Sequence, residues 1–486
     1  MANRKGYGRV YASMRRLPEE RHILHGSSFR ARLENKWRKI QASFWFIPSL
    51  MSTFSFGLAV LLLYLDAHVV ADSPFLQTLA YSGSGEGATD VLTLVASSMV
   101  GLAGVTFSIT IVALTLASGH FGPRLLRNFM KDFGNQVVLG TYISTFVYCL
   151  WVLQAMRAHA EVVTVPGLSV TGALVMALAG LSVLIFFIHH VSTAIQAGHV
   201  IGDAYGDLVE AVNRHLFELE SPADKGDDEQ DDRLLFDEEL AKVRQRNVIV
   251  HVPGRRSGYV QAIDYAYLLG LTKRLDIAVE LLVRPGDFLV GECPVLIAYS
   301  EVSLEEDLEK SVNYALFVGG QKTAEQDLEY SLDQLVEIAV RSLSTGVNDP
   351  GTAITCVDYL TAALAQASQK QFPSGMYRDP DGVARVFARR FTFAGMFDAA
   401  FHQIRQNAQG SVALYLRMLE AFSDLTPLMR TEEQQGALEV HAEMVFHACQ
   451  RQIEEQRDLD KANSRYSKIL VALQRQQKEG MDYDLG

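Results

Sequence analysis

The chain has 486 residues, of which 49% are hydrophobic, and a formal net charge of −12. Residues 1–192 carry 15 Lys and Arg against 9 Asp and Glu, whereas residues 193–486 carry 29 against 47. The acidic second part argues against a nucleic-acid partner, because binding to phosphates requires a basic surface.

Residues 1–42 form a basic segment with 11 Lys and Arg and three acids, which we place in the cytoplasm. It has no apolar core of the kind found in a secretory signal peptide. Residues 27–41 are interpreted as a basic helix lying along the inner membrane surface. The alternative is a simple positive-inside anchor.

Four apolar stretches follow, at residues 43–65, 91–118, 136–156 and 166–191, and none contains Lys, Arg, Asp or Glu. A spanning helix needs about 20 such residues, because its backbone must satisfy its own hydrogen bonds in hydrocarbon. We therefore predict an α-helical membrane domain over residues 43–192 that has the lipid bilayer as a partner.

The Lys and Arg counts of the connecting segments predict the orientation of the spans. The loop 66–90 has none, the loop 119–135 has three and the loop 157–165 has one. This alternation predicts that the N- and C-termini are both cytoplasmic, with the first and third loops outside.

The second span carries a stripe of small and hydroxyl side chains in steps of four and three, with one isoleucine. On a helix these residues share one face. Such a face is typical of close helix–helix packing, or of a pore lining in which the isoleucine is a dewetting constriction. The stripe residues are Ser97, Gly101, Gly104, Ser108, Ile111, Thr115 and Ser118.

Arg124, Arg127 and Lys131 follow this span and would share one face of a short helix at its inner mouth. They are interpreted as contacts with lipid headgroups or as a cationic ring that concentrates anions in an oligomer. His189 and His190, at the inner end of the fourth span, point about 100° apart on a helix. They are interpreted as interfacial residues and not as metal ligands.

The remainder is predicted to be an α+β cytoplasmic domain. Residues 193–239 are expected to contain a helix continuous with the fourth span and then an acidic linker. Short β-rich runs with Pro and Gly turns indicate a small barrel or sandwich at residues 240–322. Residues 323–486 are predicted to be helical, beginning at a capping box formed by Thr323 and Gln326.

The turn 344–350 is interpreted as architecture. Gly346 suits a left-handed position at a helix end, Asp349 suits an N-cap, and Pro350 suits the first helical position. Asn348 and Asp349 could alternatively belong to a catalytic site. No GxSxG, P-loop, HExxH or dinucleotide motif supports an enzyme, and the four cysteines have no CxxC spacing.

Three stretches, 101–132, 186–191 and 326–353, resemble the bacterial membrane-protein family called domain of unknown function 2254. The family pattern in the third stretch is LSPGINDP. This chain has Thr345 in place of the proline and Val347 in place of the isoleucine. The resemblance covers about residues 30–474 and implies a four-span inner-membrane protein with a cytoplasmic domain. It implies no activity.

These observations predict a homo-oligomeric, channel-like or transport protein that passes a small ion or solute and is regulated by its cytoplasmic domain. The alternative is a membrane-anchored sensor or scaffold without a conducting pore. No cofactor, metal or nucleic acid is expected.

Overall fold

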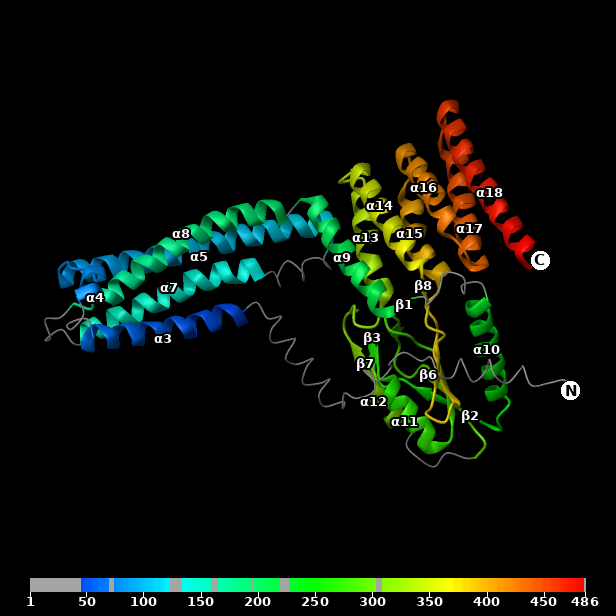
Figure 1. Ribbon diagram of the computed structural model, residues 1–486, viewed down its shortest axis with the longest axis horizontal. Coiled ribbons are helices and arrows are strands. Elements are labelled where there is room, and N and C mark those ends of the chain that lie inside the picture. The colour runs from blue at the N-terminus through cyan, green and yellow to red at the C-terminus, as the bar shows by residue number, and fades with distance from the viewer. Residues whose placement is uncertain are drawn as a thin grey trace. The chain divides into compact units, whose positions relative to one another are not determined.

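The computed structural model describes residues 45–69, 74–122, 133–158, 165–194, 196–218, 227–302 and 308–484. The chain divides into two compact units, Met1–His199 and Val200–Gly486, and each is described by itself (Figure 1). The predicted helix at residues 27–41 and the basic residues Arg124, Arg127 and Lys131 lie outside the described residues.

The first unit is built from long apolar helices. α3 (Phe46–His68), α5 (Gly85–Phe121), α7 (Phe133–Ala158) and α8 (Gly167–Ala194) are each long and apolar enough to cross a membrane, which confirms the four predicted spans. A short helix, α4 (Pro74–Leu79), precedes α5. The most apolar window of α7 is 56% buried, against 17% in each of the other three. α7 is therefore the central helix of this unit.

Asp66 joins the end of α3 to the start of α8. Its carboxylate accepts hydrogen bonds from the backbone N–H groups of Leu168 and Ser169, both at 2.9 Å, and from Ser169 Oγ at 2.7 Å. The first N–H groups of a helix have no partner within the helix, so an acidic side chain stabilises them. Asp66 was expected in a loop, but it lies within α3 and caps a second helix.

α9 (Ala197–His215) starts three residues before the second unit and has most of its length in it; β1 (Phe217–Glu218) and α10 (Asp227–Arg244) follow. The prediction of one continuous helix after the fourth span is wrong, since α8 ends at Ala194 and α9 is a separate helix. α9 buries one face within the unit, formed by Ile201, Ala204, Leu208, Ala211 and Val212.

Part of the segment expected to be an acidic linker is also helical. In α10, Leu240 and Val243 are buried in a cluster with Tyr299 and Phe387, and Phe236 packs against that cluster. These three apolar side chains lie about one helical turn apart. Packing of this face stabilises a helix whose other side chains are mostly charged.

The strands form two sheets. One has the order β2 (Val248–Pro253), β6 (Pro294–Ser300), β4 (Ala278–Leu281), β10 (Ala384–Phe387) and β9 (Met376–Arg378). The other has the order β5 (Phe288–Leu289), β3 (Gly258–Ile263) and β7 (Leu316–Gly319). With α11 (Tyr265–Leu275) and α12 (Leu308–Ala315), both sheets contribute to one hydrophobic core. A small barrel or sandwich was the expectation for this part, and the barrel is not confirmed.

The described pairings within these two sheets are antiparallel except for β4 with β10, where Val279 pairs with Val386 in parallel. β10 lies in the part of the sequence predicted to be helical. That prediction is wrong for β8 (Lys370–Gln371), β9 and β10, which lie between two helices of the helical part.

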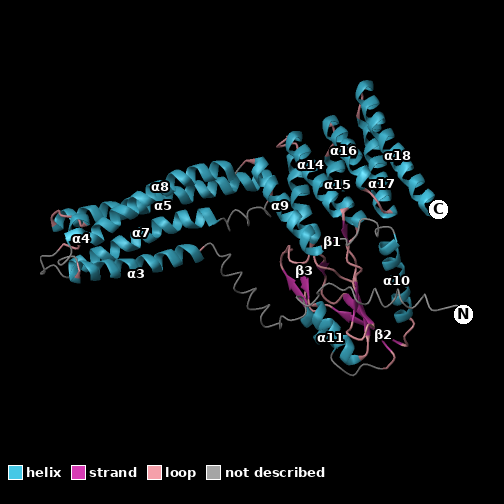
Figure 2. Cartoon of the chain, viewed as in Figure 1, coloured by secondary structure: helices cyan, strands magenta, loops and turns pink. Residues whose placement is uncertain are grey.

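The helical part consists of α13 (Leu328–Ser342), α14 (Pro350–Ala367), α15 (Phe393–Asn407), α16 (Val412–Leu425), α17 (Glu432–Gln452) and α18 (Gln456–Asp484), shown with the sheets in Figure 2. A 3-10 turn, Thr426–Leu428, follows α16. The core of the helical part is rich in aromatic side chains, with Phe393, Phe397, Phe401 and Phe422 almost fully buried.

Candidate functional site

The stripe on α5 faces away from the other helices that the structure describes in this unit. Six of its seven residues are exposed and Ser118 is half-buried; Ile111 has 47% of its surface exposed. A Cβ added to Gly101 or Gly104 would meet no atom within 4 Å. Among the residues that the structure describes, therefore, the stripe does not serve helix packing within one chain.

The opposite face of α5 packs against the rest of the unit. Its buried side chains include Leu92, Val95, Ala96, Met99 and Ala113. α5 thus has a packed face and an unpacked face, and the small residues lie on the unpacked one.

The hydroxyls of the stripe are partly satisfied by their own helix. Ser97 Oγ donates to the Thr93 carbonyl at 2.8 Å, and Thr115 Oγ1 donates to the Ile111 carbonyl at 2.9 Å. Each such oxygen keeps acceptor lone pairs. Ser97 and Thr115 can therefore offer weak oxygen ligands while their own donors are paired.

The turn before α14 has the capping role predicted for it, with one correction. Asp349 accepts hydrogen bonds from Thr352 N at 3.2 Å and Thr352 Oγ1 at 2.6 Å, and Pro350 is the first helical residue. The left-handed residue is Asn348, with φ of 49°, and not Gly346. Asparagine tolerates this conformation because its short side chain bonds locally.

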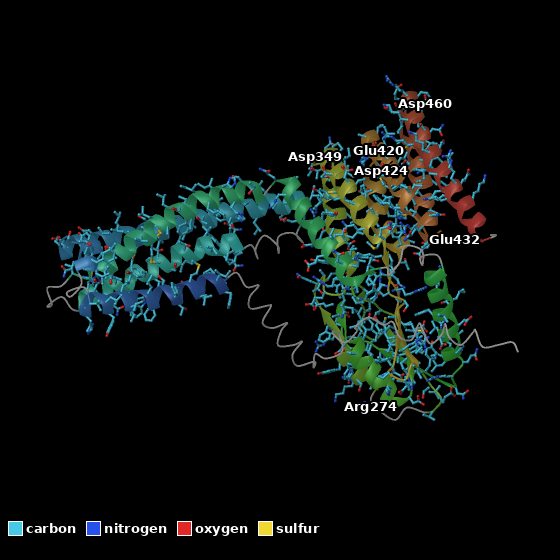
Figure 3. The ribbon with its side chains drawn as sticks, in the orientation of Figure 1. Arg274, Asp349, Glu420, Asp424, Glu432 and Asp460 are labelled. Carbon is cyan, nitrogen blue, oxygen red and sulfur yellow. The ribbon has the colours of Figure 1, made fainter. Side chains whose placement is uncertain are left out.

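The predicted capping box of α13 is wrong. The N-cap is Asp327, whose side chain accepts from Tyr330 N at 3.2 Å. Gln326 instead bonds to Ile263, where its amide accepts from the N–H and donates to the carbonyl. Asp349 lies at the upper end of the pair formed by α13 and α14, as Figure 3 shows, and is exposed. Its contacts are those of a cap.

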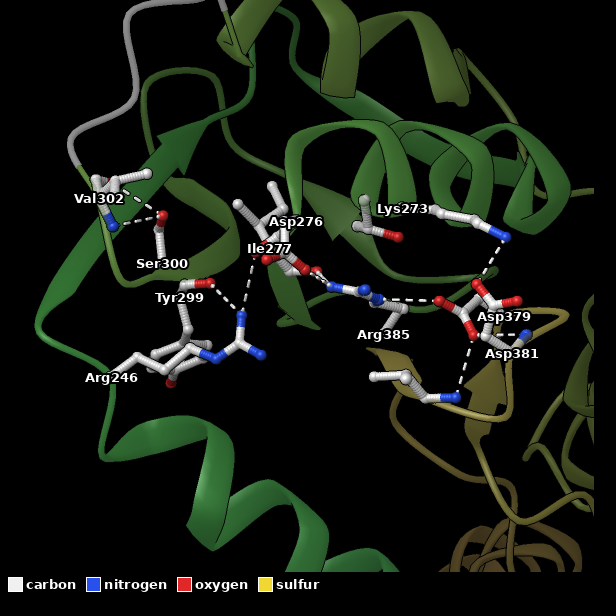
Figure 4. A network of polar contacts seen from close by, with 12 residues as sticks. Arg246, Lys273, Asp276, Ile277, Tyr299, Ser300, Val302, Asp379, Asp381 and Arg385 are labelled. Atoms are coloured by element: carbon white, nitrogen blue, oxygen red, sulfur yellow. Dashed lines mark hydrogen bonds and ion pairs between the residues drawn. The ribbon is translucent and has the colours of Figure 1, made fainter.

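A buried charged network, shown in Figure 4, was not predicted. Arg385 of β10 donates to Asp379 at 3.1 Å, to Asp276 at 2.7 Å and to the Ile277 carbonyl at 3.3 Å. Its side chain is 10% exposed and that of Asp379 is fully buried. The network joins β10 to the end of α11, where Asp276 has φ of 51°. Its role is structural, because its two buried groups, Arg385 and Asp379, are satisfied by partners within the protein, while the Asp276 side chain is exposed.

A cavity of about 260 Å³ lies in the second unit. Its wall includes two guanidinium groups, a carboxylate and two hydroxyls, so it suits a small polar ligand. The Arg390 guanidinium also lies 5.2 Å from the ring centre of Phe236. The polar lining residues are Arg233, Ser374, Arg390, Thr392 and Glu433.

Four membrane-crossing helices followed by a mixed helical and sheet domain define a polytopic α-helical membrane protein. The family model described as "Predicted membrane protein (DUF2254)" matches residues 41–424. The chain belongs to this family, as the resemblance predicted.

Two uncharacterized mycobacterial proteins are among its relatives: Rv1290c of Mycobacterium tuberculosis and Mb1321c of Mycobacterium bovis. Each is 26% identical over 425 residues, which cover 86% of this chain and 78% of the relative. No solved structure matches the chain.

Proposed function

We propose that the chain is one subunit of a homo-oligomeric, channel-like protein of the bacterial inner membrane, with its C-terminal unit in the cytoplasm as the regulatory part. The observation that carries the proposal is the exposure of the α5 stripe within a single chain. Glycine and serine let helices approach closely in a bilayer, so this face suits a second copy of α5 or a water-filled axis between copies.

The side chains of the stripe favour a pore for small ions along the axis of the oligomer. Its hydroxyl oxygens can replace part of an ion's hydration shell, and Ile111 is the one bulky apolar side chain within the stripe. An apolar ring at this position would close the axis by dewetting. The counts of Lys and Arg support the inside orientation of both termini.

Cysteine labelling tests this proposal. Ser97→Cys, Ser108→Cys and Thr115→Cys are made in a Cys293→Ser background, because Cys293 is exposed while Cys149, Cys356 and Cys449 are buried. A pore lining predicts modification of all three by a charged, water-soluble thiol reagent, together with cross-links between chains. Leu178→Cys on α8, which is 67% exposed, is the control and is expected to stay unmodified in the bilayer.

Flux measurements test conduction itself. Wild-type protein in liposomes is expected to pass small ions, and Ile111→Ser is expected to raise the flux because it removes the apolar constriction. Absence of flux in both proteins, or a monomer in multi-angle light scattering, would contradict the proposal.

The cavity beside Arg233 and Arg390 favours a second candidate, a membrane-anchored sensor whose C-terminal unit binds a small polar ligand. This candidate predicts that Arg390→Gln abolishes the response of the protein to its ligand while liposome flux is absent in wild type and variant alike. Flux that depends on the ligand would instead indicate a channel that is gated by ligand binding to the C-terminal unit.

A further inference from the structure

Three potential metal ligands meet between two helices of the second unit. Asp398 and His402 lie one turn apart on α15, and His441 lies on α17. Asp398 Oδ1 is 2.8 Å from His441 Nε2 and 3.4 Å from His402 Nδ1. The ligand atoms of the three residues all lie within 4.8 Å of one another.

We propose that Asp398, His402 and His441 bind a divalent transition-metal ion of the Zn²⁺ class. Two imidazoles and one carboxylate are a donor set that such ions prefer. Tetrahedral coordination with bonds of about 2.0–2.1 Å requires ligand atoms about 3.3 Å apart. The separations of 2.8 and 3.4 Å bracket that value, and the ligand atoms of the two imidazoles lie within 4.8 Å of each other, so metal binding requires only side-chain shifts that bring the three together.

The aromatic core holds His441 in place for this role. The imidazole is 1% exposed, and the ring centres of Phe397 and Phe401 lie 5.0 and 6.4 Å from its own. Its Nε2 atom faces Asp398 and would be the ligand atom that His441 contributes.

The other side of the site is open to solvent. The side chains of Asp398 and His402 are 61% and 41% exposed. An ion can therefore enter without opening the core, and it would keep a coordination position for water or another ligand. Arg405, on α15 with Asp398 and His402, acts electrostatically on His441, and its positive charge would repel a bound cation.

A structural hydrogen bond between His441 and Asp398 is the competing explanation, and the two make different predictions. The hydrogen bond needs no contribution from His402, whereas the metal site does. His402→Ala removes a partly exposed ligand and is expected to leave the fold intact.

The test is Zn²⁺ titration of tag-free, full-length protein in detergent after treatment with a chelator. Wild type is expected to bind one ion per chain, and His402→Ala and Asp398→Asn are each expected to weaken binding about tenfold or more. His447→Ala is the matched control, because His447 forms a similar pair with Glu443 at 3.4 Å on the exposed face of α17.

Three outcomes decide the proposal. Saturable binding that both ligand variants weaken and the control does not supports it. No saturable binding by wild type overturns it, as does equal affinity in wild type and His402→Ala. Circular dichroism of each variant verifies that a loss of binding is not a loss of fold.

Discussion

Two aspartates that cap helices in the second unit have opposite electrostatic surroundings. Asp327, at the start of α13, is 2% exposed, and burial raises its pKa to about 6. Asp349, at the start of α14, is exposed, and its hydrogen bonds to Thr352 lower its pKa. The contribution of Asp327 to folding stability therefore falls as pH rises, whereas the contribution of Asp349 increases with pH.

Asp327→Asn is expected to change the pH dependence of unfolding. Between about pH 4 and 6 the folded state keeps the Asp327 proton that the unfolded state loses, so wild-type stability falls as pH rises through this window. Asparagine can cap α13 but cannot titrate, so the variant lacks this decrease. Chemical unfolding at pH 4, 5 and 6 measures it, and equal slopes for variant and wild type would contradict the shift.

Asp349→Ala is expected to lower the free energy of unfolding by about 1 kcal/mol at pH 7, because α14 loses its side-chain cap. The wild-type contribution is present above the unfolded pKa of about 4 and is lost as pH falls through the lower folded pKa. Thermal unfolding measures the loss. A variant with unchanged stability but altered flux or catalysis would indicate a functional role instead.

At the scale of elements, the two faces of α5 predict different effects for glycine substitutions in the membrane unit. Gly104→Leu is expected to leave the monomer folded and to prevent oligomer formation, because its side chain would enter only the exposed face. Gly140→Leu on α7 is the contrast, since a Cβ there would lie 2.5 Å from Met51 Sδ and 3.3 Å from Pro48 Cα.

Light scattering and circular dichroism in detergent separate these effects. Gly104→Leu is expected to lower the mass and keep the helical signal, whereas Gly140→Leu lowers the thermal stability of the helical unit. An oligomer of unchanged mass for Gly104→Leu would show that the stripe is not an interface.

The sequence predicted best those elements that a single strong pattern determines. Charge-free stretches predict α3, α5, α7 and α8, and Asp349 with Pro350 predicts the start of α14. α10 was missed because its charges conceal the three apolar residues that pack on the sheet. β9 and β10 were missed although the Asp-Pro-Asp-Gly run at residues 379–382 is a turn signal between them.

The features that could not be predicted from the sequence depend on tertiary contacts. His441 lies about 40 residues beyond Asp398 and His402 and on another helix, and of the three proposed ligands only His441 is buried. Asp398 and His402 have helical spacing, but nothing local indicates which third residue faces them. Exposure of the α5 stripe likewise depends on where the other helices pack.

At the scale of the whole molecule, the second unit begins before the acidic segment. α9 belongs to it, because Tyr205 accepts a hydrogen bond from the Gln366 amide at 3.1 Å and its ring lies 4.8 Å from that of Tyr359. β1 also belongs to it, because it pairs with β8.

A fragment of residues 196–486 is therefore expected to unfold cooperatively as a soluble protein. One of residues 237–486 is expected to aggregate, because it lacks α9 and exposes the surface that α9 covers. Size-exclusion chromatography compares the two. A well-behaved shorter fragment would show that α9 is dispensable for the fold.

The parallel pairing of β4 with β10 also constrains the order in which the chain can fold during synthesis. About 100 residues separate the two strands, so a nascent chain leaves the ribosome with one edge of β4 unpaired until β10 has been synthesised. During that interval α13 and α14 emerge, and the open edge can pair with other strands. Chains released by ribosomes that stall before residue 384 are therefore expected to expose this edge of β4 and to be prone to aggregation.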